Sequence, residues 1–574
     1  MIENNTTIES RFMRTGSLTR VKLMEYIPVM ILTNMSVFLL STVDGLVAGN
    51  LISSQALASI NIFYPAMIAV TVISSVVDSG SATSLSTSMG TNDIERIRRT
   101  KSAVKRVMIV AALFVAVAQI PIIYVVISSY GLTPEMEKMC WEYAIGVMIA
   151  LPVGIISSVG SYQLQIIGRM RVLMVLSIVE SLSNLALDLF FVQVMHLGLM
   201  GIGFGTAVAN LIRCSATVIY LMKKTDVYQC GGVGAHWKEV KDILFCGLPD
   251  AASMFMVAWQ NYFIMRVILE YFGDEGGTIK GVCFFAFNIA TMMILGVQKS
   301  MRPLLGLYAG AGDKKEMQSL MRECMIICCV LVSIVILAVE LFPGLVYRVN
   351  GVDVIPENGI LSLRLFVLYF IFKGMDDLFR PYFANRKDSL AATGLTIFGN
   401  ATLPVFAKIL GQLLSAPFIW LGYLTTELLI FVLSQLRYRW WRKKDQKESD
   451  TEKTVLYLAV KPEEAVEASR MIRQYAKENG VEEKIAYRMA LCMEEMVAYA
   501  VQSQKDPDIQ IQIMTQFRQG EGVFFMMDNG ECLALNENAE TQELITDNYT
   551  LLKKVSKSVE YQYILNLNYT IFRF

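Results

Sequence analysis

Long apolar segments constrain the fold of this chain more than any other feature of its sequence. The first runs from Tyr26 to Leu51 and, at about 1.5 Å per helical residue, is long enough to cross a hydrocarbon core roughly 30 Å thick. Eleven more follow, near residues 56–86, 104–131, 140–165, 170–194, 200–222, 246–271, 280–308, 319–347, 360–384, 389–413 and 414–440. We therefore predict an all-α membrane protein with twelve transmembrane helices.

The composition supports a membrane protein and argues against a nucleic-acid partner. Hydrophobic residues make up 54% of the chain and charged residues only 18%, which is more apolar than an ordinary soluble protein. Basic and acidic residues each number 51, so no excess of positive charge is available to attract nucleic acid. We expect most of the chain to lie in membrane lipid.

Three clustered cysteines, Cys324, Cys328 and Cys329, lie in one apolar run without histidine or aspartate partners. We expect them to serve as small apolar side chains of a membrane helix, and we predict no metal site there.

Lysine and arginine residues concentrate in alternate loops. They follow the even-numbered apolar runs, at Arg96–Lys101, Arg169–Arg171, Lys223–Lys224, Lys314–Arg322 and Arg386–Lys387. Cytoplasmic loops retain such residues, so this pattern places both termini in the cytosol and requires an even number of spans. Residues 1–24, which include Arg11 and Arg14, contain no cleavable signal pattern, and we expect a cytosolic N-terminal segment in a bacterial inner membrane protein.

The two halves of the apolar region resemble each other at an offset of about 220 residues. Gly90–Asp93 corresponds to Gly310–Asp313, Pro28 to Pro249, and Asn184 to Asn400. An even number of spans in each half makes the repeats parallel. We predict two six-helix bundles, at residues 25–222 and 246–444, joined by a cytosolic linker at 223–245.

The character of the chain changes after Lys444. Residues 445–453 are charged and lack apolar periodicity, which is typical of a linker. Beyond them, 454–460, 509–515 and 523–527 alternate as strands do, whereas 462–478 and 482–503 have helical spacing. The sequence predicts a small α+β cytosolic domain at residues 454–574.

Short motifs in the apolar region occur in the order typical of the multidrug and toxic compound extrusion (MATE) family, which the chain resembles over nearly all of residues 20–445. They are Val43–Gly49, Gly168, Asn184–Asp188, Gly198–Gly203, Gly247–Pro249, Gln298–Pro303 and Gly310–Asp313. The resemblance implies a secondary exporter of organic substrates, including cationic drug-like molecules, that works by alternating access. It also implies antiport of H⁺ or Na⁺ and no required cofactor.

Four polar residues of the first half, Asp44, Asn184, Asp188 and Thr206, are candidates for a cation or substrate site. Asn184 and Asp188 are four positions apart and share one helical face. Ionisable groups in a membrane span are costly unless they serve a partner or an ion, and the resemblance implies a cation site at the same four residues. Two carboxyl groups suit H⁺, and the neighbouring oxygens suit Na⁺, so both ions stay open. The structural alternative is that Asp44 caps a helix and Asp188 bonds a neighbouring helix.

Further charges lie in apolar context, and structural pairing is the favoured interpretation for them. They are Asp78, Glu180, Asp250, Arg266, Glu427 and the group Lys373, Asp376 and Asp377, in which an internal ion pair is expected.

The C-terminal domain resembles the ATP-binding domain of histidine kinases, gyrase-type ATPases and, nearest, anti-sigma-factor serine kinases. The motifs are the helix Ala490–Gln502 with Glu494 and Glu495, the turn Met527–Gly530, and a final helix and two strands ending at Phe574. The resemblance implies nucleotide-binding roles for Glu495, Asp528 and Gly530.

The sequence departs from that family at its most important ligands. Tyr499 stands where the family's Mg²⁺-binding asparagine is expected, and Asp547–Thr550 replaces its glycine-rich lid. The domain also contains no histidine. We therefore expect a degenerate domain without ATPase or kinase activity, in which ATP and Mg²⁺ binding is doubtful, and a regulatory role together with a cytosolic partner protein.

Three functional hypotheses follow from these features. The first is the exporter with a regulatory tail. The second is a membrane sensor whose transporter-like part signals through the C-terminal domain to a cytosolic regulator. The third, an ATP-using signalling enzyme, is disfavoured by the missing ligands.

Overall fold

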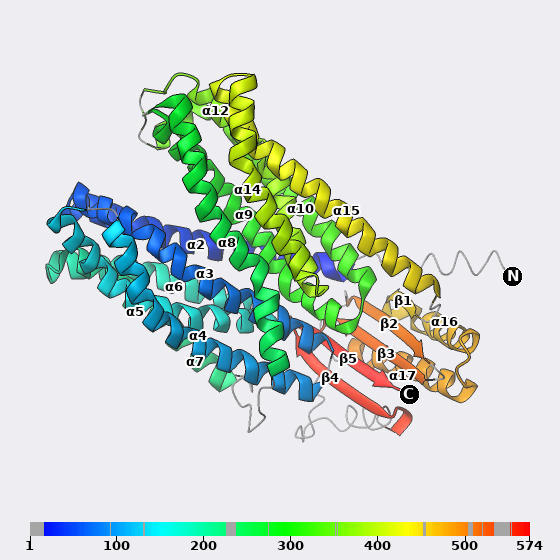
Figure 1. Ribbon diagram of the computed structural model, residues 1–574. Coiled ribbons are helices and arrows are strands. Elements are labelled where there is room, and N and C mark those ends of the chain that lie inside the picture. Colours follow the sequence, from blue (N-terminus) through cyan, green and yellow to red (C-terminus); the bar gives the residue numbers. More distant parts are fainter. Residues whose placement is uncertain are drawn as a thin grey trace.

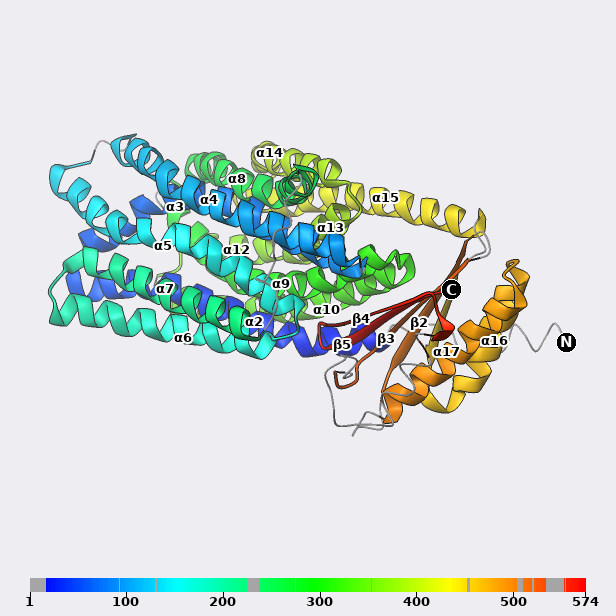
Figure 2. The same ribbon diagram turned by 90° about the horizontal axis from the view of Figure 1, so that it is seen from below.

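The computed structural model describes residues 17–91, 93–129, 132–224, 237–273, 275–350, 352, 354–451, 455–502, 509–518, 521–532, 552 and 554–574. Long helices form most of this structure, and a five-stranded sheet with two helices lies at one end of them (Figures 1 and 2). Arg11 and Arg14, residues 225–236 of the expected linker 223–245 and the expected lid Asp547–Thr550 lie outside the described residues.

The helices form two groups that follow each other in the sequence (Figure 1). The first contains α2 (Ser17–Val47), α3 (Ser54–Gly90), α4 (Ile94–Ser129), α5 (Pro134–Ile166), α6 (Met170–Leu189) and α7 (Gly198–Lys224). The second contains α8 (Trp237–Phe272), α9 (Glu275–Ala311), α10 (Lys314–Leu341), α11 (Pro343–Val349), α12 (Gly359–Val367), α13 (Phe370–Asn385), α14 (Ser389–Leu413) and α15 (Leu421–Thr451).

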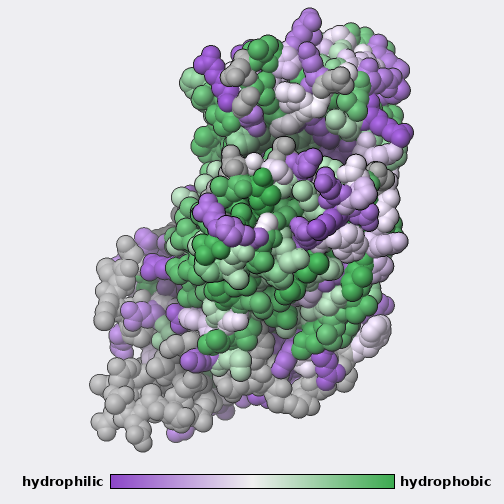
Figure 3. Space-filling view, turned by 90° about the vertical axis from the view of Figure 1, so that its left-hand side faces the viewer, coloured by the Kyte–Doolittle hydropathy of each residue, from purple (hydrophilic) through white to green (hydrophobic). Residues whose placement is uncertain are grey.

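Among the described residues, ten helices are long and apolar enough to cross a membrane. The two other expected spans coincide with α2, which has 31 residues, and with the consecutive helices α12 and α13. Apolar side chains cover much of the face drawn in Figure 3, and many of those on α4 are exposed, as contact with lipid requires. The chain is a multi-pass membrane protein, and the number twelve stays a prediction.

The two groups diverge away from the sheet and meet close to it (Figure 1). Near the sheet, α3 crosses α9 so closely that a Cβ added at Gly90 would lie 2.1 Å from the carbonyl oxygen of Leu307. The arrangement is therefore closed at the end that carries the C-terminal domain.

Cationic loop residues gather at that same end. Gly168, beside Arg169, packs on Asn566 of the domain, and Lys315 Nζ lies 4.6 Å from the ring centre of Tyr457. Two of the alternate loops predicted from their charge to share one side therefore lie at the same end of the structure.

The C-terminal sheet has the strand order β1-β2-β3-β5-β4, and every neighbouring pair is antiparallel. The strands are β1 (Val455–Val460), β2 (Ile511–Arg518), β3 (Glu521–Asp528), β4 (Ser558–Ile564) and β5 (Leu567–Arg573). They match the predicted strands, and α16 (Ala465–Glu478) and α17 (Glu483–Gln502) match the predicted helices. The expected final helix lies mostly outside the described residues.

Alternation along the strands gives the sheet two apolar faces. Phe524 and Phe572 belong to the core shared with α16 and α17. Met527, Tyr569 and Ile571 belong instead to the core that contains the membrane helices. The sheet is therefore packed between its own helices and the membrane part.

The expected linker at 445–453 is helical through Thr451, because α15 continues into it. Arg386 Nη1 donates a hydrogen bond of 2.9 Å to Asp445, and Gln318 Nε2 donates one of 3.2 Å to the same carboxylate. Asp445 thus fastens this extension to the membrane helices, a role that composition alone did not reveal. The second group also begins earlier than predicted, since α8 starts at Trp237.

Candidate cation site

Asp44 is a buried carboxylate near the end of α2 that lies away from the sheet. The Tyr143 hydroxyl donates to Asp44 Oδ2 at 2.9 Å, and the Thr206 hydroxyl donates to the same oxygen at 3.1 Å. Tyr143 comes from α5 and Thr206 from α7, so three helices meet at one carboxylate oxygen.

Asn184 and Asp188 complete the cluster from α6. Asn184 Nδ2 donates to Thr206 Oγ1 at 3.1 Å and lies 3.5 Å from Asp188 Oδ1. Asn184 and Asp188 are both fully buried, as their shared helical face predicts. The structure therefore brings together the four residues that the sequence singled out, whereas what they bind stays a prediction.

Three oxygens of this cluster are buried without a hydrogen-bond partner among the described residues. They are Asp44 Oδ1, Asp188 Oδ2 and Asn184 Oδ1. The two carboxylate oxygens can accept a proton, all three oxygens can coordinate a hard cation, and a buried polar atom without a partner is costly. Oxygens of this kind are the ligands that a site for H⁺ or Na⁺ requires, and such a site stays a prediction.

Gly205 on α7 makes room for Asp188. A Cβ added at Gly205 would lie 2.0 Å from Asp188 Oδ1, far inside van der Waals contact. Glycine at this position therefore lets the carboxylate lie directly on the backbone of α7.

Tyr143 is the member of the cluster that sequence reasoning missed. Its phenol lies in an apolar run and is fully buried in the membrane part, where a hydroxyl needs a partner. That requirement was the available signal, but the sequence did not show which helix would supply the partner.

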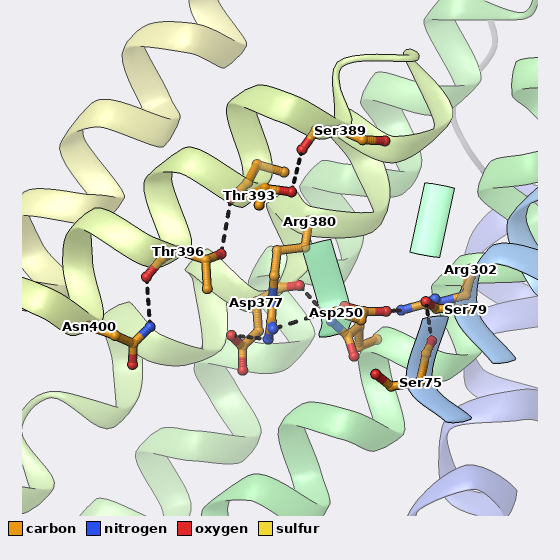
Figure 4. Close-up of polar contacts among 12 residues, drawn as sticks. Ser75, Ser79, Asp250, Arg302, Asp377, Arg380, Ser389, Thr393, Thr396 and Asn400 are labelled. Atoms are coloured by element: carbon orange, nitrogen blue, oxygen red, sulfur yellow. Dashed lines mark hydrogen bonds and ion pairs between the residues drawn. The ribbon is translucent and has the colours of Figure 1, made fainter. Parts of the chain in front are cut away.

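A second polar cluster lies in the second group, with Asp250 of α8 at its centre (Figure 4). Arg302 Nη2 is 2.7 Å from Asp250 Oδ2, and Arg380 Nη1 is 3.9 Å from Asp250 Oδ1. Ser79 of α3 lies beside this pair, so the cluster is at the boundary between the two groups (Figure 4).

Most of the other predicted membrane charges are paired, as expected. Their contacts include Arg213–Glu180 at 2.6 Å, Arg380–Asp377 at 2.5 Å, Lys373–Asp377 at 2.9 Å, Lys373–Glu427 at 3.5 Å, Ser434–Asp376 at 2.8 Å and Arg266–Tyr262 at 2.7 Å. Asp376 contacts a serine, so the expected ion pair within α13 uses Asp377.

Asn400, the counterpart of Asn184, has a different environment. Its Nδ2 donates to the carbonyl oxygen of Thr396 at 2.7 Å within its own helix (Figure 4). Four positions later the chain has Pro404, whereas the first half has Asp188. The second half thus lacks the carboxylate that completes the first-half cluster.

The predicted nucleotide residues of the C-terminal domain are only partly arranged for binding. Asp528 is buried at the end of β3, where Asn568 Nδ2 donates to it at 2.6 Å and the Gly530 amide donates at 3.0 Å. Burial raises the pKa of Asp528 to about 6. Glu495 lies on α17, where the neighbouring Glu494 accepts a hydrogen bond from Ser469.

Comparisons with known proteins agree with the geometry of the membrane part. Residues 30–190 match the MatE family model. The multidrug export protein MepA of Staphylococcus aureus is 20% identical over 375 residues, which cover 64% of this chain and 83% of MepA. The probable multidrug resistance protein NorM of Thermotoga maritima is 23% identical over 285 residues, covering 48% of this chain and 61% of NorM.

Solved MATE structures have the same fold. A MATE protein crystallised in a bent conformation superimposes with a TM-score of 0.69 and 18% identity, over 75% of this chain and 96% of that one. A MATE family transporter in an outward-facing conformation also gives 0.69, over 74% of this chain and 97% of that one. The membrane part of this chain therefore has the fold of MATE transporters, and its residues 30–190 match the sequence model of that family.

Proposed function

We propose that this chain is a secondary exporter of small organic molecules that exchanges them for H⁺ or Na⁺. The observation that carries the proposal is the buried cluster of Asp44 and Asp188 with its unpartnered oxygens, in a fold shared with transporters. The curated relatives are named as multidrug export and resistance proteins, which favours transport over sensing and over enzymatic chemistry. Cationic drug-like molecules are the substrate class proposed, and no cofactor is required.

The carboxyl pair supplies a simple coupling chemistry. Asp44 and Asp188 repel each other when both are charged, so a proton or a Na⁺ ion bound between them relieves that repulsion. Release of the ion restores the repulsion and favours a rearrangement of α2, α6 and α7. Binding of the ion and binding of the substrate can then favour different conformations.

Alternating access follows from the two helix groups. They are apart at one end and in close contact at the other, where α3 crosses α9 (Figure 1). The contact between Gly90 and Gly310, which the sequence pairs as repeat positions, supports two parallel repeats that rock about an axis between them. The cationic loops support a cytosolic location for the closed end and for both termini, in a bacterial inner membrane.

We propose that the C-terminal domain regulates this motion. The turn between β4 and β5 inserts at the first group: the Leu565 amide donates to the Ile166 carbonyl at 3.0 Å, and Tyr26 donates to the Leu565 carbonyl. Tyr569 donates to the carbonyl of Gly90 at 3.0 Å, while Tyr457 of β1 contacts Lys315 of the second group. A domain that touches both groups at the closed end stabilises closure there.

The resemblance to kinase-type ATPase domains supports a degenerate regulatory role for the tail. The Asp528 carboxylate already accepts a hydrogen bond from Asn568, and Tyr499 stands where the Mg²⁺ ligand is expected. We therefore propose neither ATP hydrolysis nor phosphate transfer. A soluble cytosolic protein is the proposed partner of the exposed side of α16 and α17.

The test is efflux from proteoliposomes that contain the full chain, with cationic dyes as substrates. Three conditions are compared: no gradient, a proton gradient and a Na⁺ gradient. The proposal expects faster efflux with one gradient than without any, which also identifies the ion. Equal rates in all three conditions for a panel of dyes would contradict it.

A further inference from the structure

An apolar groove of about 570 Å³ runs along the outer surface of the membrane part. Its floor contains Val76 of α3 and Val107 of α4, and its rim contains Phe114 of α4 and Leu244 of α8. Phe114 is 57% exposed, so the groove faces the surroundings of the helices. In a membrane protein those surroundings are lipid.

One end of the groove has a basic side chain and a tryptophan side chain. Arg106 and Trp237 line this end, and Trp237 is 75% exposed. No Lys, Arg, Asp or Glu follows Arg106 in the rest of α4, so Arg106 marks the boundary between the charged and the apolar part of that helix. Tryptophan and arginine at such a boundary are typical of the headgroup level of a bilayer.

Further basic side chains lie beyond this end of the groove. A polar pocket of about 520 Å³ between the same three helices and the end of α13 is lined by Arg96, Arg99, Lys238 and Lys241, together with Lys387. Its acidic members, Asp93, Glu239 and Asp242, are fewer than its basic ones. Arg106 itself makes no hydrogen bond or ion pair within the described part of the structure.

We propose that this groove binds one anionic phospholipid from the leaflet on the side of the C-terminal domain. An acyl chain lies between α3, α4 and α8, and the phosphate of the headgroup binds the Arg106 guanidinium. The apolar lining of the groove suits the acyl chain. The Arg106 guanidinium and the basic residues beyond it suit a negatively charged headgroup. Basic sites between transmembrane helices on one leaflet bind anionic lipids by the same chemistry.

The position of the groove gives the lipid a structural consequence. Its walls come from α3 and α4 of the first group and from α8 of the second. A ligand that contacts both groups stabilises the conformation in which α8 lies beside α3 and α4. The bound lipid therefore favours closure at the end near the sheet.

The test is native mass spectrometry of the purified full chain, loaded with equal amounts of phosphatidylglycerol and phosphatidylcholine. The unmodified chain is expected to retain more phosphatidylglycerol than phosphatidylcholine. Arg106→Gln should reduce that preference about fivefold, which is the effect of one basic residue near a lipid surface. Arg322→Gln is the control, because Arg322 is an exposed arginine of α10 outside the groove.

A second pair of variants tests the acyl chain. Val110→Trp places a large side chain in the groove and should reduce retention of both lipids, whereas Val117→Trp alters the same face of α4 outside the groove. Val110 and Val117 are 64% and 71% exposed, so both variants should fold. Equal lipid preference in the unmodified chain and Arg106→Gln, or equal retention in Val110→Trp and Val117→Trp, would overturn the proposal. Neither result depends on transport.

Discussion

Gly90 and Gly310 pack directly on each other where α3 crosses α9. A Cβ added at Gly310 would lie 2.7 Å from the Cα of Gly90, and one added at Gly90 would lie 2.9 Å from the Cα of Gly310. Two positions that correspond between the halves of the sequence are thus neighbours in space. We propose that a rotation axis between parallel repeats passes near these two glycines, whose contact lies at the closed end of the structure.

Alanine at either glycine should open this crossing. Gly90→Ala adds a methyl group where backbone atoms stand within 3 Å, so α3 and α9 must separate, at a cost of about 1–3 kcal/mol. Cys246 lines the polar pocket between the groups, and its labelling by a thiol reagent should become faster. Gly394→Ala is the matched control, because a Cβ added there has no neighbour within 4 Å among the described residues apart from its own helical turns. Unchanged labelling in Gly90→Ala would show that the crossing does not hold the end closed.

Gly205→Ala should damage the candidate cation site although none of the polar residues of the site is substituted. The added methyl group would collide with Asp188 Oδ1 and displace the carboxylate, so gradient-driven efflux should fall at least tenfold while the protein still folds. Gly281→Ala, which adds a methyl group in open space, should leave efflux unchanged. If both variants transport equally well, Asp188 does not need its present position.

Removing the Tyr569 hydroxyl should loosen the C-terminal domain. Tyr569→Phe leaves the carbonyl of Gly90 without its donor at the end of α3, which should cost about 1 kcal/mol. Hydrogen exchange of β5, measured by mass spectrometry in the full chain, should become faster. Tyr487→Phe, which alters an exposed tyrosine of the same domain, serves as the control. Identical exchange in both variants would refute a stabilising contact at this position.

The C-terminal domain should be more stable at pH 5 than at pH 7 because of Asp528. Its pKa is raised to about 6, so the protonated form that the folded domain prefers is lost as the pH rises through that value. At about 1.4 kcal/mol for each pKa unit, the shift from 3.8 to about 6 amounts to roughly 3 kcal/mol in total, of which roughly 1.3 kcal/mol falls between pH 5 and pH 7. Asp528→Asn should remove this part of the pH dependence. Exchange rates of β3, corrected for the intrinsic effect of pH, check the difference, and an equal pH dependence in both proteins would contradict it.

The sequence predicted the helices well because each must span the same apolar thickness and must satisfy its own backbone. It also predicted the Asn184 and Asp188 face, since a spacing of four residues is local information. It did not reveal Tyr143, whose partner Asp44 lies 99 positions away. Nor did it show that Asp445 belongs to a helix, because its partner Arg386 is provided by the tertiary fold. Local residue spacing was therefore enough to predict the helices and strands. Contacts between distant segments became known only from the structure.

We propose that Asp44 and Asp188 bind the ion that drives export. The most direct test of this proposal measures gradient-driven efflux for Asp44→Asn and Asp188→Asn in proteoliposomes with equal amounts of folded protein. Glu135→Gln, which alters an exposed carboxylate at the start of α5, is the control. Both aspartate variants are expected to lose the response to the gradient, whereas the control is expected to keep it. A full response in either aspartate variant would contradict the proposed ion site.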